Sequence, residues 1–240
     1  MKIKILNINV DVIDLDNLFE KLLIAKKTNQ KITINYLNIH VANEAYKNKK
    51  LLEALNDSDI VYCDGDGIRL GSYLTKQIVP PKNTGADFID ELTAFCEKNN
   101  ISIFYLGGTK EVSEKAEALF RNKYPFLSIK GFKDGYFDFN DKSVVEEINE
   151  ASPDLLIVGM GTPAQELWIR ENKGMLNAKT IWAIGGTLDY LTGKQKRGSK
   201  LMRDLHLEWL GRFLSDPLRL WKRYLIGNCL FLYRVLFGRS

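Results

Sequence analysis

The stretch Ser152–Arg170, SPDLLIVGMGTPAQELWIR, decides the fold that this 240-residue sequence predicts. Asp154–Val158 is a short apolar run with two β-branched members, as expected of a strand buried on both faces. The run ends in the turn Gly159–Pro163, and a helix pattern begins at Ala164–Arg170. A strand that turns through glycines into a helix N-terminus is a candidate anion site, because backbone N–H groups and the helix dipole favour negative charge there.

Apolar runs of strand type and amphipathic segments of helix type alternate along the chain. The predicted strands are Ile3–Val12, Lys31–Leu37, Asp59–Cys63, Ile101–Leu106, Leu127–Phe132, Asp154–Val158 and Thr180–Ile184. The predicted helices are Leu15–Lys27, Val41–Leu55, Gly85–Lys98, Glu111–Lys123, Lys142–Glu150 and Ala164–Arg170. Ser72–Pro81 is predicted to be irregular towards its end. The alternation predicts an α/β fold with a Rossmann-like, mostly parallel sheet flanked by helices.

In such a sheet the ligand crevice lies at the carboxyl ends of the strands. Polar residues and glycines follow the predicted strands at these ends: Asn38, Asp64, Gly107, Gly135, Gly161 and Gly185. Because the carboxyl ends of parallel strands lie at one edge, we expect these residues to converge on one rim.

Cysteine and histidine usage limits the classes of site. The three cysteines Cys63, Cys96 and Cys229 form no C-x-x-C, which argues against a disulfide framework or a zinc site and fits a reducing cytosol. The two histidines, His40 and His206, exclude a histidine-rich metal centre. The N-terminus alternates like a strand rather than a signal peptide, and no run approaches the ~20 apolar residues of a membrane span.

Positive charge is concentrated at the end of the sequence. From Lys194 onward there are eleven basic and three acidic side chains, so this segment carries +8 and residues 1–193 carry −4. Leu201–Leu214 and Leu218–Leu236 mix Leu, Trp, Phe and Tyr with Arg and Lys at helical spacing, with Pro217 between them. We therefore expect an α/β core over residues 1–193 and a basic amphipathic helical appendage over 194–240.

Two interpretations of the appendage remain. The helices either pack their aromatic side chains on the sheet with the arginines in water, or lie in the interface of an anionic membrane. Nucleic acid also binds basic surfaces, but the sequence contains no recognition motif for it.

The glycine turn also matches a dinucleotide-binding fingerprint, Gly159-x-Gly161-x-x-Ala164. That fingerprint requires an acidic residue at the end of the next strand, whereas Thr180–Ile184 is followed by two glycines. A nicotinamide or flavin enzyme is therefore disfavoured, and a purely structural tight turn remains an alternative to a pyrophosphate or sugar contact.

Asp64 is the candidate general base, because a carboxylate at the crevice can take a proton from an incoming hydroxyl. Asp66 competes for this role, and an isolated Asp-Gly pair is also common in turns. Asn38 alone is better explained as a helix cap. His40 is better explained as a packed or capping side chain.

Several motifs together resemble the WecG/TagA/CpsF family of bacterial glycosyltransferases. They are NIHVANEAYKN from Asn38, CDGDGIRLGS from Cys63, NTGADF from Asn83, FYLGGT from Phe104, GFKDGYF from Gly131, PDLLIVGMGTPAQELWI from Pro153, GGTLDYLTGK from Gly185 and LEWLGRFLSDPLRLWKRYL from Leu207. The resemblance covers nearly the whole chain. It implies transfer of an N-acetylmannosamine-type or uronic acid sugar from a UDP donor to a polyprenyl-diphosphate-linked sugar in cell-wall, capsule or exopolysaccharide synthesis.

By this resemblance the catalytic aspartate falls on Asp64 rather than Asp66, the asparagine of the sugar site on Asn38, and the glutamine of the P-x-Q-E loop on Gln165. The implied nucleotide-sugar-binding residues are Gly107, Gly108, Tyr136, Gly159, Gly161, Pro163, Glu166, Gly185, Gly186, Asp189 and Lys82, with Tyr136 and Asp189 at the uridine end. The candidates for gripping the acceptor diphosphate are Arg212, Arg219 and Arg223.

The chain departs from the family pattern at three positions. Tyr36 replaces a threonine, Lys82 replaces an arginine and Asp66 adds a carboxylate. Lysine lacks the bidentate fork of arginine, so these departures leave the identity of the sugar open.

We therefore expect an inverting, single-displacement transferase in which Asp64 deprotonates the acceptor hydroxyl and no metal or other cofactor is required. Its expected partners are a UDP-sugar, a polyprenyl-diphosphate-linked acceptor and the inner face of the plasma membrane, where the docked appendage completes the site. A homo-oligomer stays open. The alternative is a non-catalytic UDP-sugar sensor or membrane scaffold.

Overall fold

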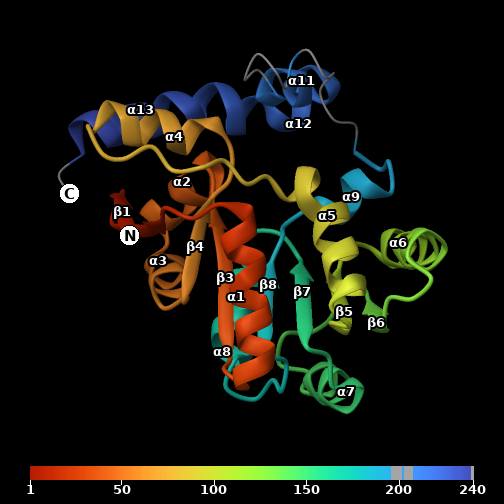
Figure 1. Ribbon diagram of the computed structural model, residues 1–240. Coiled ribbons are helices and arrows are strands. Elements are labelled where there is room, and N and C mark those ends of the chain that lie inside the picture. The colour runs from red at the N-terminus through yellow and green to blue at the C-terminus, as the bar shows by residue number, and fades with distance from the viewer. Residues whose placement is uncertain (196–201, 203–207, 239–240) are drawn as a thin grey trace.

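The computed structural model describes residues 1–195, Met202 and 208–238, and these form an α/β structure around one mostly parallel sheet (Figure 1). The strands are β1 (Lys2–Ile5), β2 (Ile8–Asp11), β3 (Ile32–Leu37), β4 (Ile60–Cys63), β5 (Ile103–Gly107), β6 (Ile129–Lys133), β7 (Leu155–Gly159) and β8 (Thr180–Ala183). Their order in the sheet is β1-β2-β4-β3-β8-β7-β5-β6. β1 and β2 pair antiparallel and every other described pair is parallel, which confirms the predicted fold class.

Helices cover both faces of the sheet and its carboxyl end. They are α1 (Leu15–Thr28), α2 (Ile39–Lys47), α3 (Lys49–Asn56), α4 (Asp66–Leu74), α5 (Gly85–Lys98), α6 (Lys110–Lys123), α7 (Ser143–Ala151), α8 (Ala164–Asn172), α9 (Thr187–Leu191), α11 (Glu208–Ser215), α12 (Pro217–Trp221), the π-helical turn η1 (Lys222–Ile226) and α13 (Gly227–Phe237).

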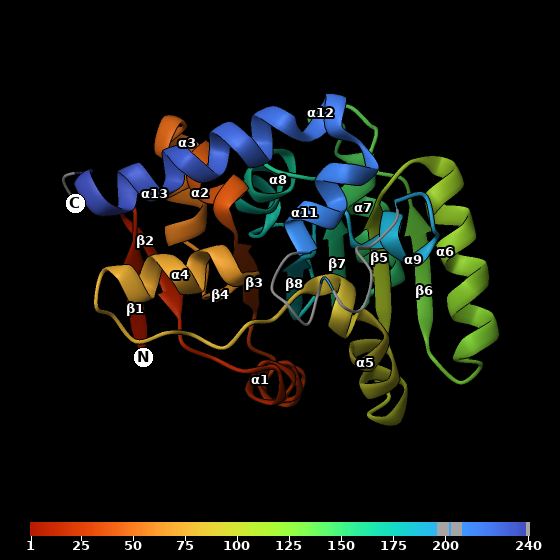
Figure 2. The ribbon, with the colours of Figure 1, turned by 90° about the horizontal axis from the view of Figure 1, so that it is seen from above.

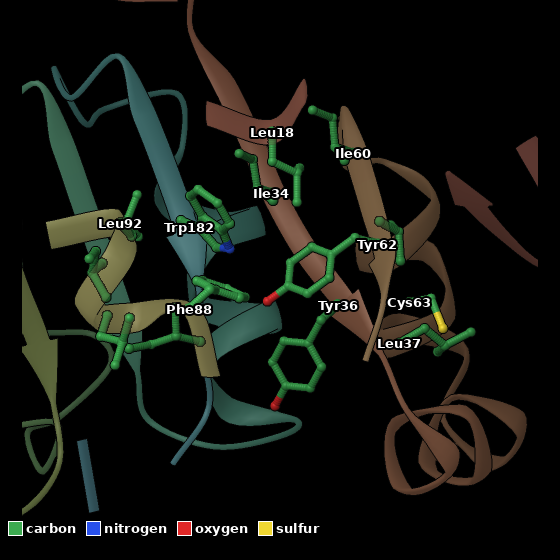
Figure 3. Packing of buried hydrophobic residues seen from close by; sticks show 14 of the residues in the cluster. Leu18, Ile34, Tyr36, Leu37, Ile60, Tyr62, Cys63, Phe88, Leu92 and Trp182 are labelled. Atoms are coloured by element: carbon green, nitrogen blue, oxygen red, sulfur yellow. The ribbon is translucent and has the colours of Figure 1, made fainter. Parts of the chain in front are cut away.

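The core is divided between the two faces of the sheet. On one face, helices α1, α5 and α6 bury an aromatic group in which Tyr62 lies 6.1 Å from Trp182 and 6.0 Å from Phe88, between ring centroids (Figure 3). On the other face, α7 and α8 pack around the fully buried Trp168. Because β5, β7 and β8 are buried along their whole length, both layers are needed to cover them.

Three predicted elements differ in the structure. The predicted strand Ile3–Val12 is a hairpin, because Leu6 and Asn7 have positive φ and reverse the chain. The predicted helix Val41–Leu55 is divided at Asn48, which ends α2 and caps α3 by accepting a hydrogen bond from Leu51 N at 3.2 Å.

The third difference is α4, a helix that was not predicted and that ends within the stretch predicted to be irregular. Glycines at 67 and 71 weaken its helix pattern, but both are required by packing. A Cβ on Gly67 would clash with Ile39, and a Cβ on Gly71 would lie 2.9 Å from the ring of Phe231. The glycines that obscure the helix in the sequence are therefore the ones that allow α2 and α13 to approach it.

Over residues 208–237 the C-terminal segment is helical, as predicted, and lies across the carboxyl ends of the strands (Figures 1 and 2). Of the predicted helix Leu201–Leu214, the structure describes only Met202 and the residues from Glu208 onward. α13 packs against α2 and α4 and buries Phe231 completely. In the parts of the chain that the structure describes, no helix is both long enough and apolar enough to span a bilayer.

Asn43 of α2 fastens this segment to the core. Its Nδ2 donates to Gly227 O at 2.7 Å, and its Oδ1 accepts from Arg234 Nη1 at 2.6 Å. The Arg234 guanidinium also lies 4.2 Å from the ring centroid of Tyr46. One amide thus holds both the beginning and the last turns of α13.

Candidate active site

A pocket of about 620 Å³ lies between the carboxyl ends of the strands and the C-terminal helices. Its charged and amide-bearing lining residues are Asn38, Asp64, Asp66, Lys82, Arg212, Arg223 and Asn228. The core and the C-terminal segment therefore both contribute polar side chains to one cavity.

Asp64 and Asn38 form the pair predicted from the strand ends. Asp64 follows β4, and its backbone N–H donates to Leu37 O at 2.9 Å, which fixes the end of β4 against the end of β3. Asn38 is the N-cap of α2, where its Oδ1 accepts from Val41 N at 3.0 Å. Its Nδ2 donates to Asp64 Oδ2 at 3.0 Å. The predicted cap is confirmed, and the same amide also orients the Asp64 carboxylate at the pocket wall.

Asp66 has different partners. At the first turn of α4, its Oδ2 accepts from Lys82 Nζ at 2.9 Å and its Oδ1 from Arg69 Nη1 at 3.3 Å. Arg69 Nε also donates to Pro80 O at 3.2 Å, so the segment that carries Lys82 is held against α4. The carboxylate of Asp66 thus contacts two cations, and that of Asp64 accepts a hydrogen bond from the Asn38 amide.

The glycine turns after β5, β6 and β7 pack against one another, but none of their glycines lines the pocket. Gly108 N donates to Gly159 O at 3.1 Å, and Gly135 N donates to Gly108 O at 2.9 Å. Gly107 has φ 151° and packs so closely that a Cβ there would clash with the Gly159 backbone. These contacts hold the turns after β5, β6 and β7 together, beside the segment that leads into α8.

Gln165 and Glu166 form a buried network that connects the turns. Gln165 is fully buried; its Oε1 accepts from Gly185 N at 3.0 Å, and its Nε2 donates to Glu166 Oε1 at 2.9 Å and to Tyr36 Oη at 3.4 Å. Glu166 Oε1 also accepts from Thr162 Oγ1 at 2.8 Å. Neither Gln165 nor Glu166 lines the pocket, so their visible role is to fix the ends of β3, β7 and β8 relative to one another.

Burial raises the pKa of Glu166 to about 7. Its Oε2 is buried and has no hydrogen-bond partner among the described residues. Tyr36, the residue that departs from the family threonine, fills the space between this network and Asp64, and its hydroxyl lies where a Cβ on Gly185 would be. Burial, Glu166 and Asp64 all raise the pKa of Tyr36, which therefore stays protonated.

The other predicted donor residues lie outside the pocket. Tyr136 is 77% exposed after β6. Asp189 is half-buried in α9, beside Gly186, and burial raises its pKa although Lys194 Nζ lies 3.8 Å away. Gly161 and Pro163 lie in the turn between β7 and α8.

Two of the three predicted arginines reach the pocket. Arg212 and Arg223 line it, and the Arg212 guanidinium lies 4.7 Å from the ring centroid of Tyr190. Arg219 forms an ion pair with Asp216, the N-cap of α12, and does not line the pocket.

His40, interpreted from the sequence as a packed or capping side chain, also lines the pocket. Burial, with Arg223 and Lys47 nearby, lowers the pKa of His40 to about 4, so its imidazole is neutral at neutral pH. Sequence reasoning missed Arg69 and Asn43. Both lie inside the quoted motifs NIHVANEAYKN and CDGDGIRLGS, but their roles depend on contacts with other segments of the chain, which the motifs do not indicate.

Within the described residues, no three His, Cys, Asp or Glu side chains are grouped as metal ligands. Lys82, Arg212 and Arg223 line the same pocket as the Asn38–Asp64 pair, and guanidinium and ammonium groups favour an anionic ligand.

Comparison with known proteins agrees with this chemistry. The profile of the "Glycosyl transferase WecG/TagA/CpsF family" matches residues 3–240. A protein of Staphylococcus aureus (strain MRSA252), named N-acetylglucosaminyldiphosphoundecaprenol N-acetyl-beta-D-mannosaminyltransferase, is 31% identical over 240 residues, covering 98% of this chain and 92% of that protein. The protein of the same name from S. aureus (strain MW2) is 30% identical with the same coverage.

Proposed function

This chain belongs to the WecG/TagA/CpsF family of glycosyltransferases, and from that premise we propose that it transfers an N-acetylmannosamine-type sugar from UDP to a polyprenyl-diphosphate-linked N-acetylglucosamine. The sugar and the acceptor in this proposal are those in the names of its relatives. The proposed product is an intermediate of cell-wall polymer synthesis. The observation that carries the proposal is the Asn38–Asp64 pair at the wall of a pocket lined by cations from both the core and the appendage.

Asp64 is proposed as the general base. A carboxylate within reach of the acceptor hydroxyl takes its proton as the oxygen attacks the anomeric carbon, and the UDP leaves from the opposite side with inversion. Asn38 keeps the carboxylate turned to the pocket through the 3.0 Å hydrogen bond from its Nδ2. Asp66 is less suited to this role, because Lys82 and Arg69 already hold its carboxylate as an ion-pair partner.

The donor diphosphate is proposed to lie against the glycine turns at Gly107–Gly108 and Gly159–Gly161. The N-terminus of α8, which follows the Gly159–Gly161 turn, provides N–H donors and positive potential for its phosphate oxygens. Gln165 does not contact the pocket but fixes the neighbouring turn at Gly185, whose N–H donates to its Oε1. Negative charge develops on the UDP as it leaves, and hydrogen-bond donors or cations stabilise it. Groups already held in position by the fold do so without a cost of reorganisation.

The acceptor diphosphate is proposed to bind Arg212 and Arg223, with Lys82 on the opposite wall. Guanidinium groups match phosphate oxygens in pairs, which favours arginine at such a site. Because both arginines belong to the C-terminal segment, the site is complete only when that segment is docked, and we propose that docking takes place at the inner surface of the plasma membrane.

The test is transfer of labelled N-acetylmannosamine from its UDP derivative to an N-acetylglucosaminyl-diphospho-polyprenol. Asp64→Asn should retain UDP binding and thermal stability while losing transfer. Arg212→Ala and Arg223→Ala should weaken binding of the acceptor and raise its KM. Arg219→Ala is the matched control, because Arg219 does not line the pocket. Wild-type turnover by Asp64→Asn would disprove the mechanism. UDP binding by the wild type without turnover on any acceptor would instead support the sensor or scaffold.

A further inference from the structure

The mouth of the pocket has two apolar rims, one of which belongs to the core. Leu70 of α4 lines the pocket and is exposed. Opposite it, Leu225 of η1 and Cys229 of α13 line the pocket and are also exposed. Figure 2 shows α4 and α13 running side by side over the strand ends. Any surface that approaches the mouth therefore meets both helices.

The exposed face of α4 is apolar. Ile68 and Ser72 are buried against the core and Gly71 faces Phe231, which leaves Leu70, Tyr73 and Leu74 outward. Tyr73 is 69% exposed, and residues 70 and 74 are four apart, so they lie on one side of the helix. Ile78 and Val79, just after α4, are exposed as well.

The outward face of α13, which packs against α4, is also apolar. Phe231 points inward, while Tyr233, Leu236 and Phe237 are exposed, Phe237 to 71%. Scattered exposed apolar side chains are ordinary, but a continuous apolar area around a cavity marks a binding surface. Here the exposed apolar side chains come from α4 and α13, two helices that are more than 150 residues apart in sequence and pack against each other.

The charges around this surface favour an anionic partner. Residues 66–82 and 216–238 together contain seven basic side chains and two acidic side chains, Asp66 and Asp216, of which Asp216 pairs with Arg219. Asp66 is already paired with Arg69 and Lys82. Apolar side chains flanked by lysine and arginine suit the headgroup and acyl boundary of an anionic bilayer.

We propose that α4 and α13 together form one lipid-contacting surface, so that the bilayer touches the catalytic core around the pocket mouth and not the appendage alone. This inference rests on the proposed function, because the diphosphate of a polyprenyl-linked acceptor reaches the pocket while its tail stays in the bilayer. The tail leaves the pocket between Leu70 and Leu225, and Tyr73 and Leu74 enter the interface beside it.

The first experiment measures binding of the full chain to vesicles of phosphatidylglycerol and phosphatidylcholine by flotation. Tyr73→Ser/Leu74→Ser should weaken binding about tenfold or more, as expected from removing two apolar side chains from an interface. The matched control is Phe126→Ser, because Phe126 is 87% exposed but precedes β6, at the amino-terminal end of the sheet. Equal binding by the double variant and the control would overturn the proposal.

The second experiment asks whether α4 itself enters the lipid. In a Cys229→Ser background, in which the remaining Cys63 and Cys96 are buried, an environment-sensitive fluorophore is attached at Tyr73→Cys or at Phe126→Cys. Vesicles should shift the emission of the label at position 73 to the blue and leave that at position 126 unchanged. No shift at 73, with vesicle binding intact, would overturn the proposal.

Two further readouts separate this surface from the transferase mechanism and from self-association. With a water-soluble short-chain acceptor, Tyr73→Ser/Leu74→Ser should transfer sugar as the wild type does, since neither residue lines the pocket. Loss of this transfer would mean that the pair acts on the site and would overturn the proposal. A wild-type oligomer that the double variant converts to a monomer in light scattering would assign the surface to a second copy of the chain instead. If the wild type transfers nothing but the vesicle results hold, the proposed function fails and the lipid surface stands.

Discussion

Asn38 and Asp64 are connected by a 3.0 Å hydrogen bond from the Asn38 amide to Asp64 Oδ2, and the same Asn38 side chain caps α2. The position of the proposed base is therefore fixed by a helix terminus rather than by a mobile loop. Both side chains follow adjacent parallel strands, β3 and β4, whose register pairs Leu37 with Cys63.

Asn38→Ala should lower kcat about tenfold to a hundredfold, because the Asp64 carboxylate loses the donor that orients it. It should also lower the free energy of unfolding by about 1 kcal/mol through loss of the cap. Asn48→Ala is the matched control, since Asn48 caps α3 in the same way without lining the pocket. Steady-state kinetics and denaturant unfolding of both variants provide the comparison. Equal kcat values for the two would show that Asn38 acts only as a cap.

The ion pair between Asp66 and Lys82 should act as a unit in substrate binding. Lys82→Met should raise the KM of the acceptor about tenfold, because it removes the ammonium group. Asp66→Asn should also raise it, because the ammonium is then no longer held at the pocket wall. The double variant should be no worse than Lys82→Met. A double-mutant cycle on kcat/KM measures this coupling. Additive effects would show that Asp66 does not position Lys82. The exposed pair Lys110 and Glu114 serves as the control cycle.

Glu166 should make the protein less stable as the pH rises towards neutrality. Its pKa of about 7 in the folded protein lies above the unfolded value of 4.5, so its full contribution is present below pH 4.5 and is lost as the pH rises to about 7. The loss is about 3 kcal/mol, from the size of the pKa difference. Glu166→Gln cannot ionise and should lack this slope in melting temperature between pH 4.5 and 7.5, whereas the exposed variant Glu150→Gln should retain it. Parallel profiles for all three proteins would contradict the prediction.

Asn43→Ala should weaken the attachment of α13 to the core without changing the binding of the UDP donor. It removes the hydrogen bonds to Gly227 and Arg234 that hold α13, so acceptor KM should rise several-fold while UDP affinity stays the same. Hydrogen exchange over residues 227–237 should increase. Asn149→Ala is the matched control, because that amide likewise bridges two backbone groups, Met175 O and Asn177 N, near the start of β8. Unchanged exchange in Asn43→Ala would exclude this role.

Much of the fold was predictable because short buried runs and amphipathic segments alternate, and this pattern is local. The errors occur where local signals conflict with packing. α4 was missed because Gly67 and Gly71 lower helix propensity, and only contact with Ile39 and Phe231 explains them. The division of the predicted helix at Asn48 was missed because asparagine is tolerated inside helices as well as at their caps.

The candidate site was predictable to the extent that strand ends determine it. Asn38 and Asp64 follow neighbouring strands and meet as expected. The burial of Gln165 was not predictable, because it depends on the Gly185 turn, which lies in a different segment of the chain. Arg219 was placed with Arg212 and Arg223 by motif alone, whereas the Asp216 cap three residues earlier binds its guanidinium.

The pocket is built from two separate parts of the sequence, and this determines how occupancy affects the whole molecule. Its described lining residues come from 38–84 and 209–232. A molecule bound there contacts both parts at once and opposes their separation. Because any ligand that prefers the folded state raises its melting temperature, resistance to heat should report how much substrate is bound, even in preparations where no turnover can be followed.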